Sequence, residues 1–423
     1  MNLEKACGVR WTEPRCQQWI LQQSVGQFRP FGSLPEFAPY VGADQRRVVG
    51  TRITKVFGNA VLFDIHHGDK FEESGERAVV ALCKLLVIWH SRWLAHQYSL
   101  HSRLYFPRTI CRRYAVRGRD LLSIAELSPD EVDKILRTAL SLKRDGGGDD
   151  LLRGKTLALL FEKPSLRTRV SFDVAMQELG GHAIYLSQAE VGLGQRESVA
   201  DVSRVLSRYV DVIAARTYSH ATQLGLARHA DVPVINALSD EEHPCQALAD
   251  LLTVLERFGS LRGVRLAFVG DGFNVAASLA EGCALTGVSF AMASPAGYSL
   301  PEQTRRTVAE LASANGGSAD FFETPADAVR GADVVYTDVW ASMGQEDSYA
   351  ARKEAFAGYA VTADLMALAK PGAIFMHDLP AHRGEEVMED VIEGPQSVVF
   401  DQAENRLHAQ KAILALTTSD HAL

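Results

Sequence analysis

The sequence predicts an α/β protein with two doubly wound parallel-sheet domains bridged by helices, preceded by an N-terminal extension of unassigned role. From about residue 117 onward, short β-branched or apolar runs alternate with amphipathic stretches of helical period. The segment Gly-Ser-Leu-Arg-Gly at 259–263 interrupts this alternation, which then restarts. Strand–helix alternation on this scale is typical of parallel sheets with helices on both faces. We therefore expect one sheet on each side of the interruption.

Apolar runs predict the strands, and the stretches between them predict the helices. Before the interruption, strands are expected at 155–161, 182–186, 210–215 and 232–237, and helices at 165–179, 198–209, 220–229 and 244–258. After it, strands are expected at 264–270, 289–293, 333–338 and 373–376, with helices at 274–285, at 405–416 and between the strands. The predicted divisions are an extension at 1–117, domains at 118–258 and 259–402, and a C-terminal helix at 403–423 that packs back on the first domain.

The composition is typical of an ordinary globular protein without a membrane span. The most apolar long stretch, 79–94, contains Lys84, His90 and Arg92, so it predicts a buried helix. The N-terminus lacks a basic segment followed by an apolar one, and the six cysteines form no CxxC pair. We therefore expect free thiols, a cytoplasmic location and no membrane partner.

Residues 1–117 differ from the rest of the chain in charge. They hold 17 Lys and Arg against 9 Asp and Glu, whereas residues 118–423 hold 27 against 43. Within this extension, 48–64 resembles strand and 76–98 resembles helix. Its acidic residues argue against a pure transit peptide, and a modest basic excess without a recognition motif is typical of a solvated surface. We expect no nucleic-acid partner, and the extension keeps no assigned role.

The segment Phe-Glu-Lys-Pro-Ser-Leu-Arg-Thr-Arg at 161–169 is the strongest functional signal. Ser165 follows a predicted strand and opens a predicted helix, where a serine is a natural N-cap. First-turn amides of a helix lack internal partners and lie at the positive end of its dipole, so they attract anions. Arg167 and Arg169 add planar sets of N–H donors that match phosphate, and Thr168 adds a hydroxyl. Serine and two arginines alone would fit an ordinary capped helix; the full segment predicts a phosphate site.

Further polar residues stand where strands end or helices begin. Arg216 follows the strand at 210–215, and parallel sheets bind ligands at their carboxyl edge. His243 and Gln246 open the next long helix and lie one turn apart, so they face the same way. Asp338 ends another strand, where a carboxylate suits an ammonium group. Each of these residues alone would also fit a surface side chain or a helix cap.

In order and together, these segments resemble the aspartate and ornithine carbamoyltransferases over about 118–417. The segment at 165–169 matches the family signature Ser-x-Arg-Thr-Arg, and His-Pro-Cys-Gln at 243–246 matches its His-Pro-x-Gln. Ser-Met-Gly at 342–344 matches the ornithine branch. The resemblance implies transfer of a carbamoyl group from carbamoyl phosphate to the δ-amine of ornithine, giving citrulline and phosphate, a step of arginine biosynthesis. It also implies a carbamoyl-phosphate-binding first domain, an ornithine-binding second domain, and no metal or organic cofactor.

The resemblance also implies a role for each matching residue. Carbamoyl phosphate would bind to Ser165, Leu166, Arg167, Thr168, Arg216, His243, Gln246 and Arg406. Ornithine would bind to Asn274, Asp338, Ser342, Met343, Asp378 and Leu379. The catalytic residues would be Asp378, His243 and Arg406, of which the last two polarise the carbonyl and stabilise its oxyanion. The family is trimeric with sites at subunit interfaces, so we expect a homotrimer or a multiple of it.

Three positions depart from the family pattern. Asp378 stands where the ornithine branch has a cysteine, and a carboxylate there could hydrogen-bond the attacking amine or take its proton. Beside Asp338 it would form a like-charge pair unless a cation lies between them. Phe273 replaces the first of two adjacent asparagines, and Gly192 replaces a glutamine that in many relatives crosses to the neighbouring subunit. Two alternatives therefore stay open: another acceptor, such as N-acetylornithine or putrescine, and a carbamoyl-phosphate-binding paralogue with impaired turnover.

Overall fold

The computed structural model describes residues 51–57, 60–65, 118–146, 148, 150–341 and 348–419. The chain divides into two compact units, Met1–Cys111 and Arg112–Leu423. In the first unit, β1 (Thr51–Phe57) pairs antiparallel with β2 (Ala60–Ile65). The strand-like stretch at 48–64 is therefore a two-stranded hairpin where it is described. The helix predicted at 76–98 lies outside the described residues.

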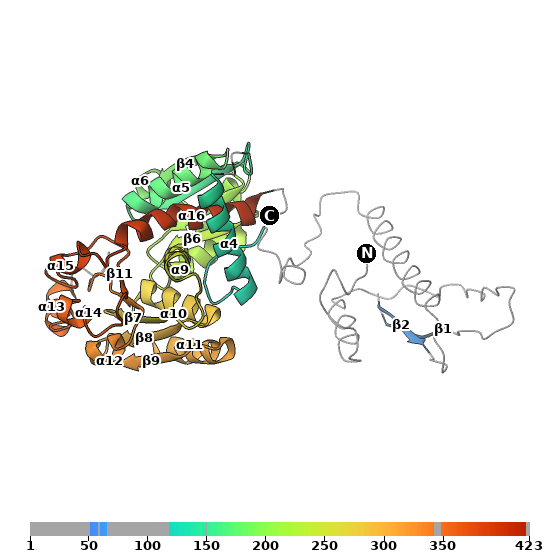
Figure 1. The fold of residues 1–423 in the computed structure, drawn as a ribbon. Coiled ribbons are helices and arrows are strands. Elements are labelled where there is room, and N and C mark those ends of the chain that lie inside the picture. The colour runs from blue at the N-terminus through green and yellow to red at the C-terminus, as the bar shows by residue number, and fades with distance from the viewer. Residues whose placement is uncertain are drawn as a thin grey trace. The chain divides into compact units, whose positions relative to one another are not determined.

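The second unit contains two parallel sheets, and Figure 1 shows helices packed around both. The first sheet has the order β4-β3-β5-β6, formed by His182–Ser187, Thr156–Phe161, Val212–Arg216 and Val234–Leu238. All of its neighbouring pairs are parallel. The helices of this half are α4 (Pro129–Asp145), α5 (Leu166–Glu178), α6 (Gln188–Val191), α7 (Val199–Leu206), α8 (His220–His229) and α9 (Pro244–Phe258).

The second sheet has the order β11-β10-β7-β8-β9, formed by Ile374–Met376, Val334–Tyr336, Arg265–Val269, Ser289–Ala293 and Ala319–Phe322. Its neighbouring pairs are also parallel. The helices of this half are α10 (Asn274–Thr286), α11 (Glu302–Asn315), α12 (Pro325–Val329), α13 (Tyr349–Ala355), α14 (Ala363–Met366) and α15 (Glu389–Ile392), and α16 (Val399–Thr418) follows them. The predicted fold class is confirmed.

The sequence analysis missed several elements, β9 and α4 among them, and misplaced several boundaries. β9 is a short, half-buried edge strand with Asp320 in its middle, so its pattern is weak. α4 begins in a capping box, in which the Ser128 N–H donates to Glu131 Oε2 at 2.7 Å, and that signature is readable in the sequence. The last helix begins at Val399, not at 405. Among the helices that the structure describes, none has the length and apolar character needed to cross a membrane.

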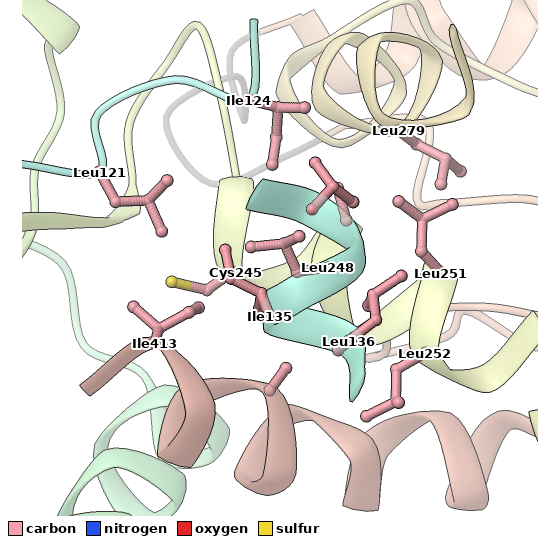
Figure 2. Close-up of a cluster of buried hydrophobic side chains, with 14 of the residues drawn as sticks. Leu121, Ile124, Ile135, Leu136, Cys245, Leu248, Leu251, Leu252, Leu279 and Ile413 are labelled. Carbon is pink, nitrogen blue, oxygen red and sulfur yellow. The ribbon is translucent and has the colours of Figure 1, made fainter. Parts of the chain in front are cut away.

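The largest apolar core joins the two halves of the second unit. It takes side chains from both sheets and from six helices, including Ile135 and Leu136 of α4, Leu248 and Leu251 of α9, Leu279 of α10 and Ile413 of α16 (Figure 2). Burial of each such side chain stabilises the fold by about 1.5–3 kcal/mol. Smaller cores lie under α7 and α8 on the first sheet and under α12, α14 and α15 on the second. Because α16 contacts α4, α5 and α9, the C-terminal helix packs against the first half.

Two carboxyl groups are buried together where these halves meet. Glu242 Oε2 accepts hydrogen bonds from the Ile124 N–H at 2.9 Å and from Ser278 Oγ at 3.0 Å. Burial, and then the charge of Glu242, raise the pKa of Glu281 to about 8. The ordinary pKa of a glutamate is near 4.5. Between that pH and about 8, the folded chain therefore keeps a proton on Glu281 that the unfolded chain has released.

This pair predicts how stability varies with pH. A raised pKa in the folded state means that the unfolding free energy falls as pH rises from about 4.5 to about 8. A Glu281→Gln variant carries no proton to lose, so it should exceed the wild type at pH 8 by on the order of 4 kcal/mol and gain much less at pH 5. Urea unfolding at the two pH values measures this, with the exposed Glu310→Gln as control. An equal effect at both pH values would contradict it.

Candidate functional site

A cavity of about 590 Å³ opens at the carboxyl ends of strands from both sheets. On the first sheet, β3 leads to Ser165 and β5 ends at Arg216. On the second, Asp338 follows β10 and Asp378 follows β11. Arg406 reaches the cavity from α16. This is the edge at which parallel α/β sheets bind ligands.

The structure brings the predicted site residues together. All of them that it describes line this cavity: Ser165, Leu166, Arg167, Thr168, Arg216, His243, Gln246, Asn274, Asp338, Asp378, Leu379 and Arg406. Ser342 and Met343 lie outside the described residues. The cavity is also lined by Lys163, Tyr349 and His382, to which the sequence assigned no role. Lys163 could have been found, since it belongs to the segment that predicts phosphate binding, whereas Tyr349 lies in no recognisable pattern.

Arg406 is the centre of one end of the cavity, which we call the donor end. Its Nη2 donates to Thr168 Oγ1 at 2.8 Å, and its Nη1 donates to Gln246 Oε1. The same Nη1 lies 3.4 Å from His243 Nε2. All four side chains are almost fully buried. Arg406 thus holds the first turn of α5 and the first turn of α9 around one point.

The donor end is strongly cationic. Arg167, Arg216, Arg406 and Lys163 all line it. Burial, and then Arg406, lower the pKa of Arg216 to about 10, which still leaves it charged at neutral pH. At the start of α5, Ser165 Oγ accepts from the Thr168 N–H at 3.3 Å, so the serine caps the helix as predicted. Buried cations around a helix N-terminus suit a small dianion such as a phosphate.

His243 is neutral in this setting. Burial, and then the charges of Arg406, Arg216 and Arg167, hold the pKa of His243 well below its ordinary value. Arginine has no acceptor, so the Nε2 that faces Arg406 accepts, and the single ring proton lies on Nδ1. That Nδ1 has no hydrogen-bond partner among the described residues, which leaves one buried donor for a ligand.

The other end of the cavity, which we call the acceptor end, carries two adjacent carboxyl groups. Asp338 and Asp378 place carboxyl oxygens within 4.8 Å of each other, and Asp338 Oδ1 accepts from the Val339 N–H at 2.6 Å. Burial, and then Asp378, raise the pKa of Asp338 well above its ordinary value. The two predicted carboxyl groups therefore lie together in the site, and the neighbouring Asp378 disfavours the ionised form of Asp338.

His377 lies beside this carboxyl pair, with its Nδ1 3.5 Å from Asp378 Oδ1. The Leu379 N–H donates to its Nδ1 at 2.9 Å, so its proton lies on Nε2, which faces Glu386 Oε1 at 3.2 Å. Asp338, His377 and Asp378 each place a possible metal ligand within 4.8 Å of the others. Because both nitrogens of His377 are engaged, the two carboxylates are the groups left for a cation, and they suit an ammonium group.

Arg167 connects the two ends directly. Its Nη2 donates to the Leu379 carbonyl oxygen at 2.7 Å, so an arginine of the donor end touches the chain that carries Asp378. Asn274, predicted to bind the acceptor, donates to the Ser239 carbonyl oxygen at 2.7 Å from the start of α10. The cavity is thus one continuous site with a cationic end and an acidic end.

The fold and this site define a two-sheet α/β protein that can hold an anionic and a cationic ligand side by side. Residues 119–256 match the family model described as the aspartate/ornithine carbamoyltransferase carbamoyl-P binding domain, and residues 262–417 match the Asp/Orn binding domain of the same family. The chain therefore belongs to the aspartate/ornithine carbamoyltransferase family and is of the carbamoyltransferase class, which confirms the resemblance seen in the sequence.

Similar proteins support this assignment in sequence and in structure. An ornithine carbamoyltransferase of Symbiobacterium thermophilum is 54% identical over 71% of this chain and 98% of its own length. The anabolic ornithine carbamoyltransferase of Pyrococcus furiosus is 52% identical over 71% of this chain and 97% of its own. The solved structure of the Pyrococcus furiosus ornithine carbamoyltransferase has 50% identity and a TM-score of 0.71, and covers 73% of this chain and 99% of that one.

Proposed function

We propose that the protein transfers the carbamoyl group of carbamoyl phosphate to the δ-amine of L-ornithine, giving L-citrulline and phosphate. The observation that carries the proposal is the single cavity with arginines at one end and the carboxyl pair of Asp338 and Asp378 at the other. The relatives named ornithine carbamoyltransferase support ornithine as the acceptor. One of them is named anabolic, which supports a place in arginine biosynthesis.

The donor end supplies electrostatic stabilisation. The phosphate would lie against Ser165, Leu166, Arg167, Thr168 and Arg216. Its carbonyl oxygen would meet Arg406 and the Nδ1–H of His243, so that both polarise the carbonyl carbon. As the amine nitrogen bonds to that carbon, the oxygen becomes an oxyanion that the same donors stabilise. The carbon–oxygen bond to phosphate then breaks, and the attacking nitrogen gives its second proton to the departing phosphate, whose remaining charge the arginines neutralise.

The acceptor end would orient the amine and take its proton. An ammonium group must become neutral before it attacks, and the carboxyl pair of Asp338 and Asp378 offers two oxygens to hold it and receive the proton. Asn274, Ser342, Met343 and Leu379 would hold the amino-acid end of ornithine. Arg167, which touches both ends, keeps the two substrates within reach of each other, and such proximity supplies much of the rate enhancement.

A panel of amines tests the acceptor. Carbamoyl phosphate is offered with L-ornithine, N-acetylornithine or putrescine, and the carbamoylated product is identified by mass spectrometry. We expect citrulline to form at least a hundredfold faster than either other product, since a pocket built for two charged amino-acid ends rejects ligands that lack one. If only another amine gives a carbamoylated product, that amine is the acceptor and ornithine is not. If no amine gives a product, the protein is better described as a paralogue without turnover.

The extension is proposed to be dispensable for catalysis. The family matches begin at residue 119, and 305 residues of this chain cover 98% of one relative and 96% of another. A chain that begins at Gly118 should therefore keep kcat and the KM of carbamoyl phosphate within about twofold, since every described cavity residue follows that point. Steady-state kinetics of both chains measure this. A tenfold loss in a folded truncated chain would give the extension a catalytic role.

A homotrimer is the proposed assembly, and the cytoplasm, predicted from the sequence, is the proposed compartment. Leu166 and Val170 on α5 and Ile184 on β4 are exposed apolar side chains, and β4 is the edge strand of its sheet. Exposed apolar side chains beside a sheet edge favour a subunit contact there. Light scattering on the eluted protein measures the mass; a monomer mass at working concentration would contradict the proposal.

A further inference from the structure

A buried hydrogen-bonded network lies behind the donor end. Asp250 belongs to α9, one turn after Gln246, and is fully buried. Its Oδ1 accepts from Gln246 Nε2 at 2.8 Å and from Gln402 Nε2 at 2.7 Å, and its Oδ2 pairs with the Tyr336 hydroxyl at 3.1 Å. Gln402 Oε1 in turn accepts from the His377 N–H at 2.8 Å. Asp250 therefore joins α9, β10, α16 and the residue after β11.

Each amide in this network has one possible orientation. Arg406 can only donate, so the Gln246 atom that meets it is the oxygen, and Nε2 must turn toward Asp250. The His377 N–H likewise requires the oxygen of Gln402, which turns that Nε2 toward Asp250 as well. Both amides thus need an acceptor at the same place, and Asp250 Oδ1 supplies it.

We propose that Asp250 is a positioning residue that holds the oxygen of Gln246 toward the cavity and so makes the site select a carbamoyl group over an acetyl group. Gln246 Oε1 has two acceptor directions, and Arg406 takes one. The second is left for an N–H of the carbamoyl group. An acetyl group has a methyl there, which cannot donate, so the buried oxygen would lose a hydrogen bond. The inference rests on the proposed function, because it takes carbamoyl phosphate as the donor.

The orientation of Gln246 is kept in both protonation states of Asp250. Burial raises the pKa of Asp250 to about 7. The ionised carboxyl accepts from both glutamines and from Tyr336. A protonated carboxyl can donate from Oδ2 to the Tyr336 oxygen while Oδ1 still accepts from both glutamines. The preference for a carbamoyl group should therefore be the same at pH 6 and pH 8.

Matched variants of Asp250 test the proposal. Asp250→Asn keeps an acceptor oxygen and loses the charge, whereas Asp250→Leu keeps the branched shape and has no acceptor. The measured quantity is the inhibition constant of acetyl phosphate, competing with carbamoyl phosphate, divided by the KM of carbamoyl phosphate. We expect Asp250→Leu to lower this ratio about tenfold, with Asp250→Asn and the control Tyr336→Phe within about twofold of wild type. Inhibition by inorganic phosphate should stay unchanged in all, because the arginines are untouched.

Two outcomes would overturn the inference. A wild-type ratio in Asp250→Leu would show that Asp250 does not set the preference. An equal loss in Asp250→Asn and Asp250→Leu would show that the charge matters and the acceptor oxygen does not. If the wild type itself forms no product from carbamoyl phosphate, the proposed function fails, and that result is distinct from either of these.

A swapped pair keeps the inference testable if Asp250→Leu does not fold. Gln246→Glu sets two carboxyl groups against each other, and adding Asp250→Asn restores an amide–carboxyl pair of the same shape. The double variant should recover the acetyl-to-carbamoyl ratio relative to the single variant, because the asparagine amide donates to the new carboxyl group, whereas two facing carboxyl groups repel and displace it from the cavity. A single variant with the wild-type ratio, or a double variant no better than the single, contradicts the proposal.

Discussion

Replacing Arg406 with methionine is expected to lower kcat/KM for carbamoyl phosphate by about a thousandfold. Methionine fills a similar volume without donating, so Thr168, Gln246 and the substrate oxygen would lose the donor that meets all three. Removal of one such donor to a developing oxyanion costs about 10²–10³ in rate, and loss of a buried charge near the phosphate adds to this. Steady-state kinetics with both substrates measure the effect.

Arg257→Met is the matched control for Arg406→Met. Arg257 lies on α9 and pairs with Asp401 at the surface, far less buried than Arg406. Such surface pairs contribute about 0–1 kcal/mol, so this variant should keep its activity and its thermal unfolding midpoint nearly unchanged. If Arg406→Met folds and its kcat/KM stays within fivefold of wild type, Arg406 is not a catalytic residue.

Replacing Asp378 with asparagine should lower kcat by about 10²–10⁴. Asparagine keeps the size of the side chain and its hydrogen bonding, but it cannot take a proton from the amine, and general base catalysis contributes about that factor. Asp378→Cys restores the residue expected in the ornithine branch, so it should be more active than Asp378→Asn. An asparagine variant as active as the wild type would remove Asp378 from the chemistry.

The same variant predicts a change in pH dependence. In the wild type, burial and Asp378 raise the pKa of Asp338, so the pair holds a proton at low pH that an ammonium group must displace. The KM of ornithine should therefore fall as pH rises through that raised pKa. Asp378→Asn removes the neighbouring charge, which lowers the pKa of Asp338 and moves the fall in KM to lower pH. A KM–pH curve that does not move would show that Asp378 does not raise the pKa of Asp338.

The sequence predicted the parts of the site that local chain patterns specify. Ser165, Arg216 and Asp338 each stand at the end of an apolar strand, and the parallel fold brings those ends to one edge. The sheets were predicted for the same reason, since strand and helix periods are local. The short edge strand β9 was missed because an edge needs few apolar residues.

Contacts between distant segments were beyond that reasoning. In the sequence, Asp250 is one polar residue in an apolar helix. Its hydrogen-bond partners, Tyr336 on β10 and Gln402 on α16, are far from it along the chain. Tyr349 lines the cavity from α13 without any pattern that marks it. The Asp338–Asp378 pair was predictable only because the family resemblance placed both residues at the same end of the cavity. Networks of this kind depend on how the two sheets pack, which no local period encodes.

Binding of a bisubstrate analogue tests the central claim, that one cavity holds donor and acceptor side by side. The analogue joins a phosphonate in place of the donor phosphate to the δ-nitrogen of ornithine. Isothermal titration should give one analogue bound per chain, with affinity lowered at least tenfold by Arg406→Met at one end and by Asp378→Asn at the other. Wild-type binding that neither variant weakens, or that only one of them weakens, would contradict a single shared site.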